Sequence, residues 1–111
     1  MIFVTGGAYQ GKKEFALKYF NNYDIIDNYH IIIKNLILEN IDPLKYTKNI
    51  ISENNNIIII MDEIGCGIVP VDREERLWRE ICGKCGCIIA EKADIVVRVT
   101  CGIGTTIKGE L

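Results

Sequence analysis

The chain has 111 residues, enough for one domain with a single core and too few for a separate substrate domain. Its net charge of −2 comes from 13 basic and 15 acidic residues, and because the basic residues are scattered we expect no nucleic-acid partner. No apolar run is long enough to cross a membrane, the start does not resemble a signal peptide, and the five cysteines are odd in number, so we expect a cytoplasmic protein with reduced thiols and no membrane partner.

The chain begins with an apolar strand, a glycine-rich loop and a helix. Residues 1–5 form an apolar run that predicts a buried strand, and residues 12–20 carry apolar side chains at helical spacing. The segment between them reads Gly6-Gly-Ala-Tyr-Gln-Gly-Lys-Lys13. In the phosphate loop G-x-x-x-x-G-K-[ST], glycines let backbone N–H groups approach phosphate oxygens, the lysine binds the outer phosphates and the final hydroxyl ligates magnesium. Gly6, Gly11 and Lys12 fit this pattern, whereas Lys13 replaces the hydroxyl.

This segment predicts a nucleotide site, because the N-terminal N–H groups of a helix also attract phosphate. The residues expected to bind the nucleotide are Gly6, Gly7, Ala8, Tyr9, Gln10, Gly11, Lys12 and Lys13. Residues 1–111 are then a single nucleotide-binding domain. The alternative is an ordinary strand-to-helix turn without a ligand.

The rest of the chain continues to alternate between strands and helices. We expect a strand over residues 24–27, a helix over 29–38, a helix that starts at Asp42-Pro43 and runs to the turn at residues 54–56, and a strand over 57–61. After a loop over 62–71, Asp72 is the expected N-cap of a helix that Gly83 and Gly86 weaken; a strand over 94–100 and an extended piece ending near Lys108 follow. This alternation predicts an α/β fold with a mainly parallel sheet.

Several segments of the chain resemble one known family. In the second half they read Asp62-Glu-Ile-Gly-Cys-Gly-Ile-Val-Pro70, Arg76-Leu-Trp-Arg-Glu80 and Ala90-Glu-Lys-Ala-Asp94, followed by Gly102 and Lys108. They resemble the patterns N-E-V-G-x-G-I-V-P, R-x-F-R-D, A-x-x-A-D and G-x-P-x-x-x-K of the bifunctional adenosylcobinamide kinase and adenosylcobinamide-phosphate guanylyltransferase family of cobalamin biosynthesis. Residues 27–36 are similar to that family's D-C-L-T-L-W-L-x-N-L, and residues 6–13 to its loop G-G-x-R-S-G-K-S.

The resemblance implies a three-layer α/β fold of the phosphate-loop NTPase type. It also implies phosphoryl transfer from ATP or GTP, with Mg, to the aminopropanol hydroxyl of adenosylcobinamide, so that the partners are a nucleotide and a corrinoid. Members of this family assemble through subunit contacts that build the site. We therefore expect a homo-oligomer, in particular a trimer.

Departures from the family pattern predict that part of this activity is lost. The family carries its guanylylated histidine in an H-R-x-x-R segment before the D-C-L-T strand, and this chain has no such segment. His30, the chain's single histidine, falls on the D-C-L-T threonine, and we interpret it as a half-buried polar residue. Asp62 replaces the asparagine of N-E-V-G, and its charge has no assigned use. We expect the guanylyltransferase half-reaction to be lost.

Three residues are the candidates for catalysis: Lys12, Asp27 and Glu63. Lys12 would hold the outer phosphates. Asp27, at the end of a strand, would bind the magnesium directly or through water, or else cap the next helix. Glu63, at the end of the most apolar strand, would orient the substrate hydroxyl, or else be a structural acid that accepts from nearby backbone N–H groups.

Three closely spaced cysteines suggest a different site. Cys82, Cys85 and Cys87 have the spacing C-x-x-C-x-C, which allows a zinc or iron–sulfur site. The spacing falls within a predicted helix, and reduced structural cysteines are the other interpretation.

Three classes of function follow from these observations. The first is a trimmed kinase of the family, with Lys12, Asp27 and Glu63 in the roles given above. The second is a non-catalytic nucleotide- or corrinoid-binding homologue that acts as a regulator or subunit, which Lys13 and the missing segment favour. The third is a structural module without a ligand.

Overall fold

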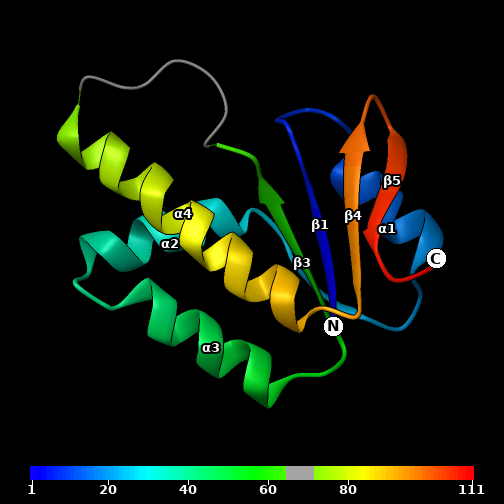
Figure 1. The fold of residues 1–111 in the computed structure, drawn as a ribbon, viewed down its shortest axis with the longest axis horizontal. Coiled ribbons are helices and arrows are strands. Elements are labelled where there is room, and N and C mark those ends of the chain that lie inside the picture. Colours follow the sequence, from blue (N-terminus) through cyan, green and yellow to red (C-terminus); the bar gives the residue numbers. More distant parts are fainter. Residues whose placement is uncertain (65–71) are drawn as a thin grey trace.

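The computed structural model describes residues 1–64 and 72–111, in which strands and helices alternate (Figure 1). The strands are β1 (Ile2–Gly6), β2 (Asp24–Ile26), β3 (Ile57–Asp62), β4 (Ile95–Thr100) and β5 (Ile103–Lys108). The helices are α1 (Lys12–Tyr19), α2 (Tyr29–Leu38), α3 (Pro43–Glu53) and α4 (Arg73–Lys92). These elements lie close to their predicted ranges. Residues 65–71, most of the predicted loop, lie outside the described residues.

One five-stranded sheet joins the strands in the order β2-β3-β1-β4-β5. β2, β3, β1 and β4 are parallel, and β5 pairs antiparallel with β4. In this register Ile2 lies between Ile58 and Ile95, and Gly6 lies beside Asp62. The mainly parallel sheet that the alternation predicted is confirmed. Because parallel strands end at the same edge of a sheet, the segments that follow β1, β2 and β3 meet there.

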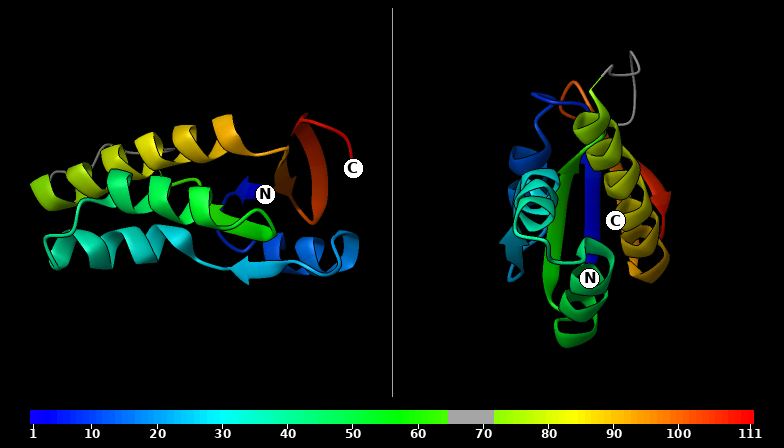
Figure 2. Two further views of the ribbon diagram at one scale, coloured as in Figure 1. Left: turned by 90° about the horizontal axis from the view of Figure 1, so that it is seen from below. Right: turned by 90° about the vertical axis from the view of Figure 1, so that its left-hand side faces the viewer.

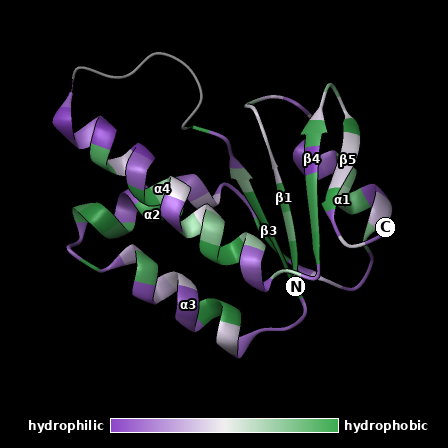
Figure 3. Cartoon of the chain, viewed as in Figure 1, coloured by the Kyte–Doolittle hydropathy of each residue, from purple (hydrophilic) through white to green (hydrophobic). Residues whose placement is uncertain are grey.

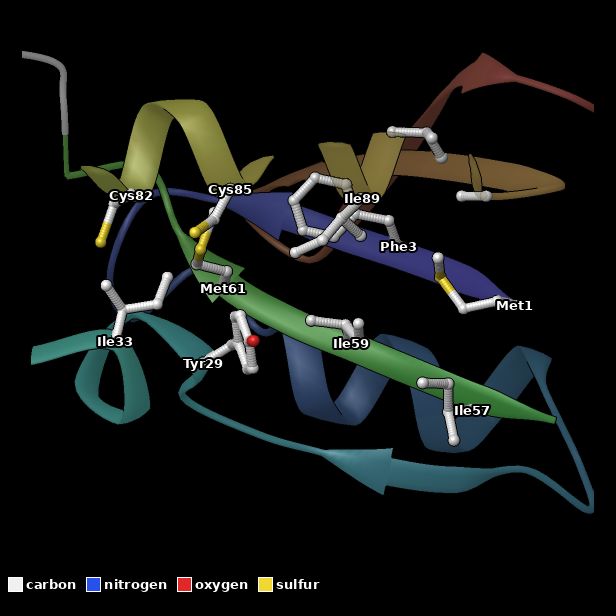
Figure 4. Close-up of a cluster of buried hydrophobic side chains, with 12 residues drawn as sticks. Met1, Phe3, Tyr29, Ile33, Ile57, Ile59, Met61, Cys82, Cys85 and Ile89 are labelled. Atoms are coloured by element: carbon white, nitrogen blue, oxygen red, sulfur yellow. The ribbon is translucent and has the colours of Figure 1, made fainter. Parts of the chain in front are cut away.

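Helices cover both faces of the sheet, as the two side views show (Figure 2). On one face, Phe15 and Ala16 of α1 pack with Val4 and Ile60 of the sheet. The other face carries α2, α3 and α4 around a larger core, part of which is drawn in Figure 4. Gly104 of β5 allows Phe15 to pack closely, because a Cβ there would overlap the aromatic ring. The predicted three-layer fold of the phosphate-loop NTPase type is confirmed.

Hydropathy follows this layered arrangement. Figure 3 shows hydrophobic residues along β3 and β4 and hydrophilic residues over the first turns of α4. β3 is buried from Ile57 to Met61, as its continuous apolar run predicted. None of the helices in residues 1–64 and 72–111 combines the length and the apolar character needed to cross a membrane.

Both ends of α4 are held by side chains. Asp72 is the N-cap, as predicted, and its carboxylate accepts from the Glu74 N–H (2.9 Å). At the other end, the Lys108 ammonium donates to the carbonyls of Ala90 and Glu91 (3.1 and 2.7 Å). A cation bonded to the last carbonyls of a helix satisfies them and interacts favourably with the helix dipole. Lys108 thus fastens α4 to the edge of the sheet.

The two glycines that we expected to weaken α4 do not interrupt it. The helix is continuous over its 20 residues. A Cβ on Gly86 would lie 3.2 Å from Met61 Cε on β3, so glycine at this position permits close packing of α4 on the sheet. Tertiary packing therefore outweighs the low helix propensity of glycine here.

Candidate functional site

The loop between β1 and α1 has the backbone shape that its glycines allow. Gly6 ends β1 with a φ of 150°, and a Cβ there would overlap the carbonyl oxygen of Val99 on β4. Gly11 is the N-cap of α1 and has a left-handed φ of 86°. Both positions therefore favour glycine strongly. Since α1 starts directly after Gly11, its N-terminal end opens on the loop, where an anion is favoured.

The turn between β4 and β5 holds the loop from the side. The Gly102 N–H donates to the Gln10 carbonyl (2.8 Å), and the Cys101 N–H donates to Gln10 Oε1 (2.7 Å). The preceding residue, Tyr9, has a left-handed φ of 59° and a fully exposed side chain. Gln10 therefore anchors the loop to the hairpin, and Tyr9 stands at the loop's tip.

A pocket of 520 Å³ opens beside the loop. Its wall comes from the loop, from the first turns of α1 and α2 and from the end of β3. The lining residues are Ala8, Tyr9, Gln10, Gly11, Lys12, Lys13, Glu14, Asp27, Asn28, His30, Ile31, Ile60 and Asp62. Most of the residues predicted to bind nucleotide, those from Ala8 to Lys13, thus share one pocket with Asp27.

Lys12, His30 and Asp62 meet in this pocket, the first two buried and Asp62 half-buried, and we call them the lysine–aspartate–histidine cluster. The Lys12 ammonium lies 2.6 Å from Asp62 Oδ1 and donates to the Gly7 carbonyl (2.7 Å). His30 Nδ1 accepts from the Asp62 backbone N–H (3.1 Å), and His30 Nε2 lies 3.4 Å from Asp62 Oδ2. The Lys12 and His30 side chains are 8% and 7% exposed. The predicted phosphate-binding lysine is therefore held by a carboxylate that sequence reasoning left without a role.

The surroundings of His30 favour its neutral form. Burial lowers its pKa, the Asp62 carboxylate opposes that shift and the Lys12 ammonium adds to it. Because Nδ1 accepts a hydrogen bond, the ring proton of the neutral imidazole is on Nε2 and faces Asp62 Oδ2. The indole N–H of Trp78 on α4 donates to the His30 carbonyl (2.7 Å), which fixes the start of α2. Asp62 is therefore engaged through both carboxylate oxygens.

Asp27, between β2 and α2, also lines the pocket. Its Oδ1 accepts from the Asn28 N–H (2.8 Å), and its Oδ2 lies 4.0 Å from the Lys13 ammonium. The alternative that Asp27 caps α2 is wrong, because Asn28 holds the N-cap position. A magnesium ligand at Asp27 stays a prediction. Lys13, which replaces the loop hydroxyl, turns its ammonium toward this carboxylate.

Glu63 lies outside the pocket lining. Its backbone N–H donates to the Gly6 carbonyl (2.8 Å), and its two carboxylate oxygens accept from Arg98 Nε and Nη2 (2.9 and 3.0 Å). The alternative of a structural acid had assigned backbone N–H groups as partners, whereas the observed partner is a guanidinium. Contact between Glu63 and a substrate stays a prediction, and the geometry makes Asp62 the β3 carboxylate that faces the loop.

Asp62 and His30 are the site residues whose role sequence reasoning missed. The interpretation of His30 as half-buried is wrong, since the residue is 6% exposed. The strand pairing contains the missing signal. β1 and β3 are parallel neighbours and Gly6 pairs with Asp62, so the residue that ends β3 must lie beside the start of the loop.

The three cysteines on α4 lie away from this pocket, two of them in the core. Cys82 and Cys85 are buried, whereas Cys87 is exposed. Burial raises the pKa of Cys82 to about 12, with a smaller contribution from Cys85, so this thiol stays protonated at neutral pH. Metal ligation needs a thiolate. Within residues 1–64 and 72–111, no three His, Cys, Asp or Glu side chains lie close enough to hold a metal ion by themselves.

Comparison with known proteins identifies a family for most of the chain. The family model described as cobinamide kinase / cobinamide phosphate guanyltransferase matches residues 25–107. That range starts after the loop at residues 6–13. The chain is also 40% identical over 52 residues to the bifunctional adenosylcobalamin biosynthesis protein CobU of Salmonella typhimurium strain LT2. This match covers 47% of the chain and 29% of the relative. Because the family model matches most of its length, the chain belongs to the cobinamide kinase / cobinamide phosphate guanyltransferase family.

Proposed function

We propose that this protein acts in cobalamin biosynthesis as an adenosylcobinamide kinase that transfers the terminal phosphoryl group of ATP or GTP to the aminopropanol hydroxyl of adenosylcobinamide. One observation carries the proposal: the glycine loop of a member of this family places a buried lysine, Lys12, in a 520 Å³ pocket at the carboxyl edge of the sheet. Open α/β sheets bind ligands at this edge. A pocket of this size is within the range of small-molecule sites.

The loop residues would hold the triphosphate. Backbone N–H groups after Gly7 and at the start of α1 would donate to phosphate oxygens, and the Lys12 ammonium would move from Asp62 Oδ1 to the outer phosphates. Gln10 would keep the loop open through its bonds to the β4–β5 turn. Catalysis of phosphoryl transfer depends mainly on such positioning and on charge stabilisation.

The pocket also fits magnesium by the chemistry of its donors. Asp27 and Asp62 both line it, and magnesium binds through one or two carboxylates together with phosphate oxygens. These two residues would hold the ion, which neutralises charge on the phosphates. Asp27 keeps its orientation through the Asn28 N–H, so one carboxylate oxygen is left for this role.

Loss of the guanylyltransferase half-reaction is part of the proposal. No H-R-x-x-R sequence lies between α1 and β2. His30 could serve as a substitute nucleophile only by leaving Asp62, which it contacts through both ring nitrogens. We therefore assign His30 a positioning role.

We also propose a homo-oligomer, with a trimer as the expected form. The edge strand β5 exposes Ile103 and Ile107, whose exposed fractions are 71% and 61%. Exposed apolar side chains on an edge strand favour contact with another subunit. Light scattering coupled to gel filtration tests this, and a monodisperse monomer at micromolar concentration would contradict it.

The first test of the proposed function is isothermal titration of the protein with ATP and GTP, with and without magnesium. Lys12→Ala removes the cation that would pair with the outer phosphates. Truncating one member of such a charge pair typically costs about 2 kcal/mol or more, so magnesium–nucleotide binding should weaken about 30-fold or more. The matched control is Lys18→Ala, which removes an exposed lysine of the same helix. Absence of nucleotide binding by the wild type would contradict the proposal.

A non-catalytic nucleotide- or corrinoid-binding homologue is the second candidate, and Lys13 is the observation that favours it. Its ammonium lies 4.0 Å from Asp27 and therefore competes with magnesium for that carboxylate. The candidates differ in turnover. Phosphorylation of adenosylcobinamide by ATP or GTP supports the kinase, whereas nucleotide binding without product supports the regulator or subunit.

A further inference from the structure

Tyr9, at the tip of the loop between β1 and α1, combines an unfavourable backbone conformation with an exposed aromatic ring. Its φ of 59° lies in the left-handed region, and its side chain is 103% exposed. Three of the five non-glycine residues with positive φ in residues 1–64 and 72–111 are asparagine, which tolerates this conformation better than tyrosine does. Because the ring is fully exposed, the folded chain gains no burial from a tyrosine at this position.

The backbone on both sides of Tyr9 is held in place. The Gln10 carbonyl and Oε1 accept from two N–H groups of the β4–β5 turn (2.8 and 2.7 Å), and Gln10 Nε2 donates to the Ala8 carbonyl (3.4 Å). A ligand that packs against the ring would therefore lose little affinity to the ordering of the loop. Tyr9 also lines the pocket, and its full exposure places the ring at the rim.

The position of Lys12 indicates which ligand would meet this ring. The Lys12 ammonium reaches back across the loop to the Gly7 carbonyl (2.7 Å), so Tyr9 lies between these two residues in the loop. In the proposed function Lys12 binds the outer phosphates, which puts the terminal phosphate beside the loop tip and the nucleobase at the opposite end of the triphosphate. An acceptor must approach the terminal phosphate in line with the bond that breaks. The acceptor, rather than the nucleobase, would therefore reach Tyr9.

We propose that Tyr9 is a specificity-determining residue for the phosphoryl acceptor, whose ring selects an alcohol carried on a large apolar body such as a corrinoid macrocycle. The inference rests on the proposed function, because it assumes that Lys12 holds the terminal phosphate. Most other residues that line the pocket are charged or polar, so the ring of Tyr9 is the surface at the rim on which an apolar group can pack. The family pattern G-G-x-R-S-G-K-S has arginine at this position, which makes the ring a feature of this chain.

The test is isothermal titration with two ligands, magnesium–ATP and adenosylcobinamide. The second ligand is added to protein saturated with magnesium and a non-hydrolysable ATP analogue, so that no transfer occurs. Tyr9→Ala and Tyr9→Asn remove the ring, and asparagine does so without straining the loop. We expect both variants to bind adenosylcobinamide about tenfold more weakly than the wild type, with unchanged affinity for magnesium–ATP. Tyr9→Phe, which keeps the ring, and Tyr46→Ala, on α3 outside the pocket lining, should bind both ligands as the wild type does.

The outcomes separate this inference from the proposed function. If the wild type binds both ligands and Tyr9→Asn keeps its affinity for adenosylcobinamide, the role of Tyr9 is wrong while the proposed function stands. If Tyr9→Asn weakens ATP binding but not the binding of inorganic triphosphate, the ring packs on the nucleobase and the inference is overturned. A wild type that binds magnesium–ATP but not adenosylcobinamide overturns both the inference and the proposed acceptor, and one that binds neither ligand overturns the nucleotide site as well. Circular dichroism verifies folding, and Tyr9→Asn alone decides the matter should Tyr9→Ala fail to fold.

Discussion

Tyr29 and His30 are neighbours in the chain, yet their side chains enter two different interiors of the protein, the apolar core and the lysine–aspartate–histidine cluster. Tyr29 enters the core under α4 (Figure 4), where its hydroxyl lies 2.6 Å from Thr47 Oγ1 and burial raises its pKa to about 12. His30 enters the lysine–aspartate–histidine cluster. Burial favours the neutral form of both side chains, but only His30 has charged neighbours.

The difference shows how one helix start can serve both stability and binding. Around Tyr29 every partner is neutral: the Thr47 hydroxyl donates to the Pro43 carbonyl (2.7 Å) and lies near Cys85. Such a network offers nothing to an ionic ligand. Around His30, the opposite charges of Lys12 and Asp62 satisfy each other, and an ionic ligand can take over either one. Substitutions in the core should therefore change folding, and substitutions in the cluster should change binding.

The largest effect is expected from a cavity on the core side. Ile33 of α2 is fully buried in the same cluster as Tyr29, and Ile33→Ala should lower the free energy of unfolding by about 2–5 kcal/mol. The measurement is urea unfolding followed by circular dichroism. Ile31→Ala makes the same change at an exposed position of the same helix, and it should cost well under 1 kcal/mol. Equal losses in the two variants would contradict the assigned core.

A smaller effect is expected from removing the Tyr29 hydroxyl. Tyr29→Phe deletes one buried hydrogen bond, while Thr47 keeps its bond to the Pro43 carbonyl. We expect a loss of about 1 kcal/mol in the free energy of unfolding. Tyr46→Phe, on a partly exposed residue of α3, is the matched control. The nucleotide affinity of Tyr29→Phe should equal that of the wild type. A stability loss accompanied by weaker nucleotide binding would contradict the separation of the core from the cluster.

The fold was predictable because its signals are local. The unbroken apolar run from Ile57 to Met61 predicted β3, and Asp72 predicted the start of α4 through the backbone N–H that it caps. The glycines of the loop likewise predicted a phosphate-binding turn, since Gly11 adopts the left-handed conformation that glycine favours. Each of these signals depends on residues that are near each other in the sequence.

The cluster was not predictable from such signals, because its members come from three elements. Lys12, His30 and Asp62 meet only when β3 lies beside β1 and α2 follows the neighbouring strand. The Glu63–Arg98 pair also joins residues 35 positions apart. A pattern of residue types gives the sign of these charges, whereas strand order decides which of them meet.

The pH dependence of stability tests the cluster directly. Burial lowers the pKa of His30 below its ordinary value in the folded protein. Between that lowered value and the ordinary one of about 6.5, the unfolded chain binds more protons than the folded chain, so stability falls as the pH falls. The charged groups that face His30 are Asp62, Lys12 and Asp27.

Urea unfolding at several pH values between about 7.5 and 5 measures this dependence above the ordinary range of carboxyl groups. Because His30 is the chain's single histidine, His30→Gln should flatten the curve over this range. The Tyr29→Phe curve should keep the wild-type slope at a lower free energy. A wild-type slope that survives in His30→Gln would show that another group binds the proton.

The last comparison concerns the reactivity of the cysteines, which should differ between the core and the surface. It needs no substitution and therefore leaves the stability of the protein unchanged. Burial raises the pKa of Cys82 to about 12 and also raises that of Cys85, whereas Cys87 and Cys101 are exposed. Since the thiolate is the reactive form, a brief treatment of the folded protein with iodoacetamide should modify the exposed pair and leave the buried pair intact. Peptide mass mapping reads out each site, and urea-unfolded protein is the control in which all five cysteines, Cys66 included, should react. Rapid labelling of Cys82 or Cys85 in the folded protein would mean that the core opens beside Tyr29, and the distinction between the two interiors would then fail.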